Sequence, residues 1–229
     1  MDVKPLILYE DNHLLAINKP AGILVQGDRT GDPTLLDFAK NYIKVEYGKP
    51  GAVYLGLIHR LDRPVSGVIL FAKTSKALTR MNAKFQHQQI NKKYYALCEK
   101  RPAVESDLLV HWLKKNSKEN RTTAYKREVT GGKRAELEYE LKMVLERRCL
   151  LEILPLTGRP HQIRVQLSSI GCTIIGDTKY GFKGTGTGSI ALHARAVHFE
   201  HPVKKEPLVI EAPVPNNQFW KPFKSVLSD

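Results

Sequence analysis

The alternation of apolar and polar positions is clearest from Ala135 to Glu146. Every second residue from Ala135 to Leu145 is apolar, and most of the residues between them are charged. A period of two is typical of a β-strand with one buried face. Arg147-Arg148 is expected to turn the chain, and Leu150–Leu154 to return beside this strand as its partner.

Shorter apolar runs predict further strands, and segments with a period near 3.6 predict helices. The turn residues Gly131-Gly132 indicate a hairpin turn in the middle of the chain. The predicted strands are Leu6–Tyr9, His13–Ile17, Leu55–Ile58, Val68–Ala72, Lys92–Glu99 and Ala191–Phe199. The predicted helices are Leu35–Val45 with Thr34 as its cap, Thr74 or Ser75 to Gln88, and Pro160 to Gly171, with Pro160 in the first helical position.

Strands outnumber helices, and the two do not alternate regularly. This pattern favours an α+β fold with mainly antiparallel sheets. A chain of 229 residues with 42% hydrophobic residues is long enough for one domain, or for two lobes that share a core.

Charge adds an expectation about partners. The chain carries 36 Lys and Arg against 23 Asp and Glu, a net charge of +13, which is typical of proteins that bind nucleic acid. The segment Ser106–Arg134 is especially basic. Three scattered cysteines, no signal-peptide pattern and no apolar run of membrane-spanning length predict a soluble cytoplasmic protein with reduced thiols, which we expect to be a monomer.

Candidate chemistry centres on a charged loop between two apolar runs, Leu55–Ile58 and Val68–Ala72. This loop holds Asp62 between Arg60 and Arg63. Nearby positive charge favours an ionised carboxylate, which suits nucleophilic attack or proton removal better than acid catalysis. The structural alternative is that Asp62 caps a turn and pairs with one of the two arginines.

Three motifs in a fixed order resemble those of the RluA-type RNA pseudouridine synthases. They are Asn18-Lys19-Pro20-Ala21-Gly22, the stretch His59-Arg60-Leu61-Asp62 followed by Ser66-Gly67, and Gly158-Arg159-Pro160-His161-Gln162-Ile163-Arg164. The resemblance extends from about Tyr9 to about Phe199. It implies a mixed, mainly antiparallel sheet with flanking helices and a basic catalytic cleft, formed by residues 1–229 as a single catalytic domain without an accessory RNA-binding domain.

The resemblance also implies an activity and its residues. The enzyme would convert uridine to pseudouridine in rRNA, in tRNA or in both, without a cofactor or a metal. Asp62 would attack the nucleoside or remove a proton from it, and Arg164 would pair with Asp62 and keep it ionised. Tyr94 would lie against the target base, although the neighbouring Tyr95 is an alternative, because adjacent strand residues point to opposite faces.

RNA contact is expected from four residues. Arg60 matches the family arginine that takes the place of the flipped base, and its planar guanidinium suits stacking. Lys19 precedes a proline on a loop, a position that suits phosphate contact, and Arg159 and His161 belong to the third motif. The alternatives are that Arg60 only pairs with Asp62 and that Lys19 is solvated.

Other classes of function fit less well. Glycoside hydrolases need paired carboxylates, and no second carboxylate lies near Asp62 in the sequence. His193, His198 and His201 with Glu200 do not have the spacing of a known metal site, and the glycines near Gly184 do not form a nucleotide-binding motif. The main alternative is a non-catalytic RNA-binding module, which would tolerate Asp62→Asn.

Overall fold

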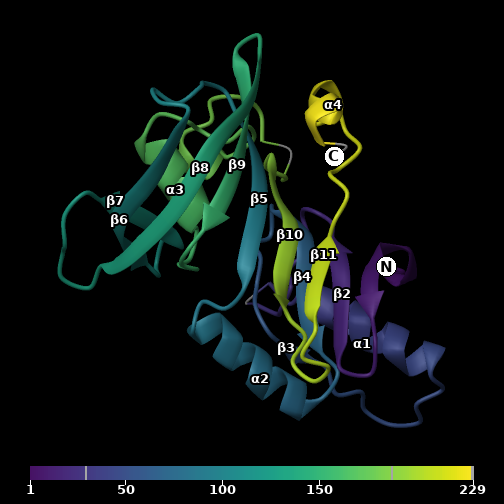
Figure 1. Ribbon diagram of the computed structural model, residues 1–229. Coiled ribbons are helices and arrows are strands. Elements are labelled where there is room, and N and C mark those ends of the chain that lie inside the picture. Colours follow the sequence, from purple (N-terminus) through teal and green to yellow (C-terminus); the bar gives the residue numbers. More distant parts are fainter. Residues whose placement is uncertain (29, 187, 228–229) are drawn as a thin grey trace. The chain divides into compact units, whose positions relative to one another are not determined.

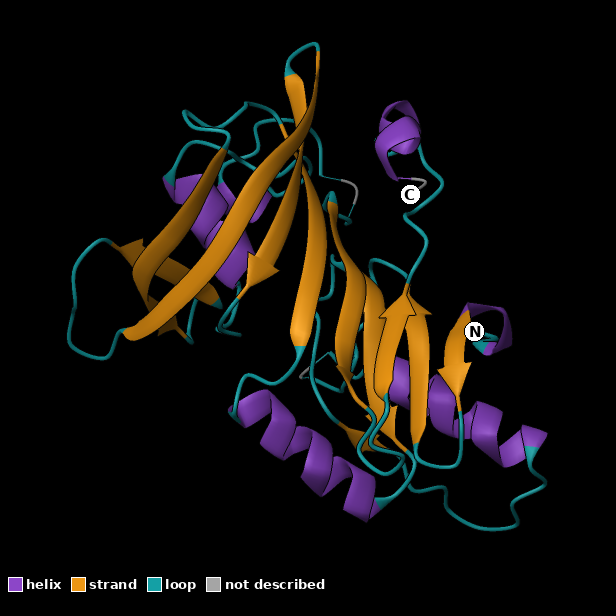
Figure 2. Ribbon diagram, viewed as in Figure 1, coloured by secondary structure: helices purple, strands orange, loops and turns teal. Residues whose placement is uncertain are grey.

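The computed structural model describes residues 1–28, 30–186 and 188–227 and is drawn in Figures 1 and 2. The chain forms two compact units. The first consists of Met1–Ile90 with Ala194–Pro213, and the second of Asn91–His193 with Val214–Asp229. The prediction of an α+β fold with a mainly antiparallel sheet is confirmed.

The first unit contains strands in the order β1-β2-β4-β10, with β3 also paired to β4 and β11 to β10. Residues of β4 are buried along its whole length, which explains why its sequence is a continuous apolar run rather than an alternating one. Its elements are the 3-10 helix η1 (Lys4–Leu6), β1 (Ile7–Glu10), β2 (Leu14–Lys19), α1 (Leu35–Glu46), β3 (Gly56–Leu57), β4 (Ser66–Ala72), α2 (Ser75–Gln86), β10 (Leu192–Glu200, with Ala194 onward in this unit) and β11 (Pro207–Glu211).

Local sequence accounts for both helices of this unit. Thr34 caps α1 in a capping box: its hydroxyl accepts a hydrogen bond from the Asp37 backbone N–H, and the Asp37 carboxylate accepts one from the Thr34 N–H. Thr74 caps α2 in the same position. Met81 of α2 packs in a core that includes Leu14 of β2 and several apolar residues of β4.

The second unit contains strands in the order β5-β9-β8-β6-β7, and each adjacent pair is antiparallel. Helix α3 packs over one face of this sheet, where Val165 contacts Leu113 of β6 and Ala135 of β8. Its elements are β5 (Asn91–Cys98), β6 (Ser106–Asn116), β7 (Arg121–Tyr125), β8 (Lys133–Leu145), β9 (Arg148–Pro155), α3 (Gln162–Ser169) and the short helices η2 (Thr178–Tyr180), η3 (Lys221–Phe223) and α4 (Lys224–Leu227).

Two expectations about this unit are wrong. Gly131-Gly132 is not the turn of a hairpin, because β7 and β8, which it separates, both pair with β6 and not with each other. Helix α3 begins at Gln162 and not at Pro160, because His161 has a left-handed backbone with φ 56° that a continuous helix cannot contain. The expected end of this helix at Gly171, with φ +81°, is confirmed.

Cys98, Cys149 and Cys172 are free thiols and are buried in the second unit, as the sequence predicts. None of the helices formed by the described residues is long and apolar enough to cross a membrane.

Candidate active site

Asp62 lies on the loop between β3 and β4 of the first unit. Ile58, Leu61 and Val65 are buried on either side of it, whereas Asp62 is only partly buried and Arg60 is exposed. The Asp62 carbonyl accepts a hydrogen bond from the Val65 N–H at 3.0 Å. The apolar residues therefore fix the loop backbone, and the charged residues between them stay accessible.

Two residues of the second motif, His59 and Gly67, hold this loop against the sheet. His59 Nε2 accepts a hydrogen bond from the Leu70 N–H of β4 at 3.1 Å, and its ring stacks on Phe85 with 5.1 Å between ring centroids. Gly67 has φ +116°, and a Cβ at this position would overlap the backbone carbonyl of Ala194. The Ser-Gly of the motif is thus explained by the close approach of β4 and β10.

The first motif holds the Asp62 loop from another side. Lys19 is fully buried, and its ammonium group donates to the carbonyls of Pro20 at 2.9 Å, Ile23 at 2.8 Å and Arg63 at 3.1 Å. The Gly22 N–H also donates to the Arg63 carbonyl at 2.8 Å. Two segments about forty residues apart in the sequence are therefore joined directly behind the aspartate.

Burial lowers the pKa of Lys19 to about 7, and the negative charge of Asp62 acts in the opposite direction. Three carbonyl contacts use all three N–H groups of an ammonium. This placement differs from the exposed phosphate-binding lysine that the sequence predicts.

Arg164 and Asp177 form a buried bidentate ion pair in the second unit. Arg164 Nε donates to Asp177 Oδ2 at 2.7 Å and Nη2 donates to Oδ1 at 2.8 Å, and the two side chains are 6% and 1% exposed. The guanidinium carbon lies 5.1 Å from the centroid of the Tyr180 ring. Since an aspartate and an aromatic ring both contact the guanidinium, its plane is strongly fixed.

Tyr180 connects the arginine to the start of its helix. Its hydroxyl accepts a hydrogen bond from the Thr122 N–H at 2.9 Å and lies 2.7 Å from His161 Nδ1. The His161 ring is thereby tied to Tyr180 at the residue that precedes α3. Burial raises the pKa of Tyr180, which keeps the hydroxyl protonated.

Gln162 fixes the loop that precedes α3. Its Oε1 accepts hydrogen bonds from the Thr157 hydroxyl at 2.7 Å and the Arg159 N–H at 2.9 Å, and its Nε2 donates to the Glu136 carbonyl at 2.9 Å. Arg159 is exposed, and its Nε donates to the Arg134 carbonyl at 3.0 Å. The third motif thus combines an exposed arginine in the loop before α3 with a buried arginine in the helix itself.

Tyr94 and Tyr95 point to opposite faces of β5. Tyr94 pairs in register with Ile153 of β9, on the sheet face that α3 covers, and it is only partly buried. Tyr95 pairs with Glu152 on the other face. Tyr94 therefore lies on the same face of the sheet as α3, the helix that carries Arg164.

Each unit therefore gathers part of the predicted site. Lys19, Arg60 and Asp62 belong to the first unit, and Tyr94, Arg159, His161 and Arg164 to the second. The pairing of Arg164 with Asp62 joins residues of the two units and stays a prediction. Sequence reasoning missed Asp177 and Tyr180, although an acid and an aromatic residue stand three positions apart between Gly176 and Gly181.

Histidines near the end of β10 have structural contacts. His201 Nδ1 accepts hydrogen bonds from the Val203 and Lys204 N–H groups, and Nε2 lies 3.0 Å from an Asp11 carboxylate oxygen. Within residues 1–28, 30–186 and 188–227 there is no group of three or more His, Cys, Asp or Glu side chains arranged to hold a metal ion.

Comparison with known proteins identifies relatives over most of the chain. A family model described as RNA pseudouridylate synthase matches residues 13–169. The chain is 33% identical over 218 residues to ribosomal large subunit pseudouridine synthase C of Buchnera aphidicola, which covers 91% of this chain and 67% of that protein. It is 32% identical over 222 residues to the protein of the same name from Yersinia pestis, covering 92% and 66%.

The chain thus spans about two thirds of the length of these relatives. Among solved structures, it resembles human RNA pseudouridylate synthase domain containing 4 with a TM-score of 0.78 and 24% identity, covering 93% of this chain and 90% of that one. At this level of identity the structural match supports the fold.

Proposed function

Since this chain belongs to the RNA pseudouridylate synthase family and is an isomerase that converts uridine in RNA to pseudouridine, we propose that Asp62 is its catalytic carboxylate. The observation that carries this proposal is the loop itself. Asp62 is partly exposed on a segment that Lys19, Gly22, His59 and buried apolar residues hold in place. A carboxylate held in this way is suited to meet a nucleoside in a reproducible geometry.

The structural alternative for Asp62 is weakened by its neighbour. Arg63 directs its guanidinium to Asp32 at 2.9 Å and its Nε to the Gly22 carbonyl at 2.9 Å. These contacts engage Arg63 with other residues, and we propose that Arg164 pairs with Asp62 and keeps it ionised. The bidentate contact with Asp177 occupies one edge of the Arg164 guanidinium, and the Nη1 edge faces away from that carboxylate.

The reaction needs bond exchange and no redox step. The bond between uracil N1 and ribose breaks, the base turns, and a bond from C5 to the same ribose carbon forms; C5 loses a proton and N1 gains one. We propose that Asp62 either attacks the nucleoside or removes a proton from it, and that Tyr94 contacts the base and takes part in proton transfer.

Access to the base requires that the target uridine leave its stack. Arg60 is exposed two residues before Asp62, between the buried Ile58 and Leu61. We propose that its guanidinium fills the space left by the flipped base, while the exposed Arg159 and the partly buried His161 contact the RNA backbone. For Lys19 the buried position favours a supporting role for the Asp62 loop in place of direct phosphate contact.

The substrate class follows from the relatives. Both bacterial relatives described above are named for the ribosomal large subunit, and we propose large-subunit rRNA as the substrate of this chain, with tRNA as the alternative. We also propose that the enzyme works as a monomer in the cytoplasm. Mapping of pseudouridine in RNA from cells that lack this protein tests the substrate, and sedimentation of the purified protein tests the monomer.

Substitution of the aspartate tests the catalytic proposal. Asp62→Asn should lower single-turnover pseudouridine formation by about 10⁴-fold or more, while RNA binding stays within about threefold of wild type. The matched control is Asp2→Asn, an exposed aspartate of the same unit, which should keep wild-type activity. Full activity in Asp62→Asn would refute the assignment.

A further inference from the structure

Helix α3 covers one face of the second unit's sheet and leaves the other face open at the edge of the sheet. The strand register identifies the residues of β6 and β8 that share this face: Trp112 lies opposite Arg134, and Leu108 lies opposite Glu138. Trp112 also lies opposite Tyr125 of the edge strand β7. Since alternate residues share a face, Lys114 lies on the same side as this row.

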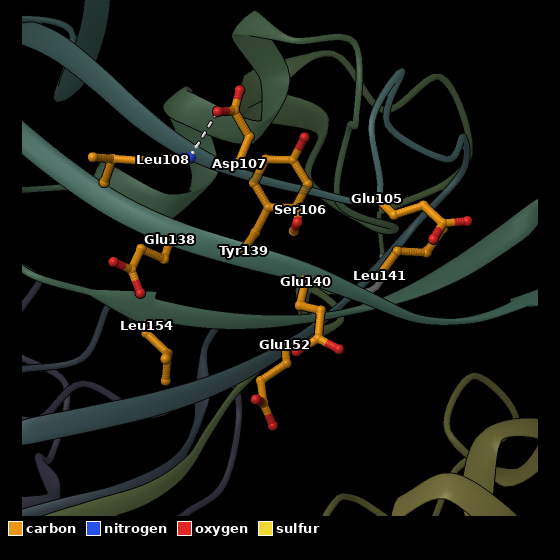
Figure 3. Close-up of a pocket in the computed structure, with 10 residues that line it drawn as sticks. All are labelled: Glu105, Ser106, Asp107, Leu108, Glu138, Tyr139, Glu140, Leu141, Glu152 and Leu154. Carbon is orange, nitrogen blue, oxygen red and sulfur yellow. Dashed lines mark hydrogen bonds between the residues drawn. The ribbon is translucent and has the colours of Figure 1, made fainter.

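Charge along this open face is polarised. One end forms a pocket on β6, β8 and β9, and Figure 3 shows its acidic side chains. Lys142 pairs with Glu140 at 2.7 Å and lies 3.8 Å from Glu152, which offsets only part of the negative charge. Of the acidic residues that line the pocket, Glu138, Glu140 and Glu152 share this face, whereas Asp107 lies opposite Tyr139 on the face that α3 covers.

The other end of the face is basic and aromatic. Tyr125, Trp112 and Arg134 form a row across three neighbouring strands, and Lys114 is exposed beside it. Tyr125 is 39% exposed, and the Arg134 side chain is 59% exposed although its guanidinium pairs with Glu136 of the same strand face. An accessible aromatic ring next to cationic side chains is the combination that binds single-stranded RNA, because bases stack on the ring and phosphates contact the cations.

This basic end is attached to the predicted RNA-contacting residues. Arg159 Nε donates to the carbonyl of Arg134, a member of the row. Thr122 of β7 points to the opposite face, where its hydroxyl donates to the Pro160 carbonyl at 3.1 Å and its N–H donates to the Tyr180 hydroxyl. The edge strand β7 is therefore held against the third motif and cannot move independently of it.

We propose that Tyr125, Trp112, Arg134 and Lys114 form an RNA-binding platform on the open face of β7, β6 and β8. An unpaired base of the substrate stacks on Tyr125, and Lys114 and Arg134 contact phosphates. The acidic pocket on the same face repels phosphates, so it directs the RNA toward Arg159 and away from β9. The inference rests on the proposed function only in taking RNA as the partner.

Binding of defined RNA to the full chain tests the platform. The probe is a fluorescein-labelled stem-loop RNA with a single-stranded oligouridylate arm, measured by anisotropy between 50 and 300 mM KCl. The loss of one stacked base lowers affinity by about 5- to 100-fold, so Tyr125→Ala should weaken binding to that extent without a change in the salt dependence. Tyr125→Phe keeps the ring and should bind like wild type.

Charge reversal separates phosphate contact from stacking. Lys114→Glu should weaken binding and reduce the slope of log affinity against log salt by about 0.7, the value for one lost contact to single-stranded RNA. Lys49→Glu makes the same charge change at an exposed position of the first unit and should leave the slope unchanged. Circular dichroism of each variant checks that its fold is intact.

A crosslinking measurement does not depend on the folding of any variant. Oligouridylate that contains 4-thiouridine should crosslink to the β7 peptide with Tyr125 in the wild-type chain. Wild-type affinity in both Tyr125→Ala and Lys114→Glu, or the absence of crosslinks from β7, would overturn the platform. An enzyme that forms no pseudouridine in any RNA would instead overturn the proposed substrate, whatever these binding results are.

Discussion

Replacement of Asp177 by Asn tests whether the buried ion pair supports Arg164. The substitution keeps the size of the side chain but removes its charge, and its amide nitrogen would face an N–H donor of the guanidinium. Breaking a buried pair by removing one partner costs about 3–5 kcal/mol, because the remaining charge is left without compensation. Exposures of 6% and 1% place this pair in that class.

Tryptophan fluorescence measures this effect selectively. The chain has two tryptophans, Trp112 and Trp220, and both belong to the second unit, which also contains the ion pair. With an m-value of about 2 kcal/mol per molar urea, a loss of 3–5 kcal/mol lowers the unfolding midpoint by about 1.5–2.5 M. Pseudouridine formation should fall through kcat more than through KM, since Arg164 is proposed to act on Asp62 and not on RNA binding.

Controls separate the ion pair from a general effect of losing a carboxylate. Asp107→Asn, in the same unit but exposed, should change the unfolding free energy by less than about 0.5 kcal/mol. The double variant Arg164→Met with Asp177→Asn should be more stable than Asp177→Asn alone, because no buried charge remains. An Asp177→Asn protein within 1 kcal/mol of wild type would refute the argument.

Three further predictions concern the first unit. Between pH 7 and 10 the unfolded chain holds a proton on Lys19 that the folded chain lacks, because burial lowers the pKa of Lys19 to about 7. The unfolding free energy should therefore rise by up to about 1.4 kcal/mol per pH unit across this window. Urea unfolding followed by circular dichroism should show this rise in the wild-type protein. The same rise in Lys19→Met would contradict its assignment to Lys19. Gly67→Ala should cost more than about 4 kcal/mol because the new methyl group overlaps the Ala194 carbonyl, whereas Gly51→Ala meets no atom within 4 Å and should be neutral in thermal unfolding. Thr34→Ala should cost about 1 kcal/mol through loss of the α1 cap, and an unchanged melting temperature would show that the capping box contributes nothing.

The sequence predicted elements whose local pattern and tertiary environment agree. The strand from Ala135 was predictable because its alternation matches a sheet with one covered face, and α1 because Thr34 and Asp37 mark its start. Strand β6 was missed because four of its last five residues, from Trp112 to Asn116, are polar or aromatic and exposed or only partly buried. Its pairing with both β7 and β8 is a long-range property that no local window contains.

Prediction of the site was limited in the same way, because it too depends on long-range contacts. Motif residues such as Asp62 and Arg164 were recognisable one at a time, but Asp177 lies in a glycine-bounded loop without a hydrophobic period. Its importance depends on a partner thirteen positions earlier, on α3. The roles of Gln162 and Tyr180 likewise depend on contacts made after folding, with Glu136 and Thr122 respectively.

The position of Lys19 shows why a residue of the right type in a motif need not contact the substrate. Three backbone carbonyls converge where β2 ends beside the Asp62 loop, and burying them without donors would be costly. A hydroxyl or an amide could not supply three N–H donors at the end of a flexible stem, whereas protonated Lys19 does so at pH values below its lowered pKa of about 7. The negative charge of Asp62 lies close enough to raise the pKa of Lys19 against the effect of burial. The lysine of the first motif is therefore best explained as an internal support of the Asp62 loop, and we propose that the positive charge that meets RNA comes from exposed residues such as Arg60, Arg159 and Lys114.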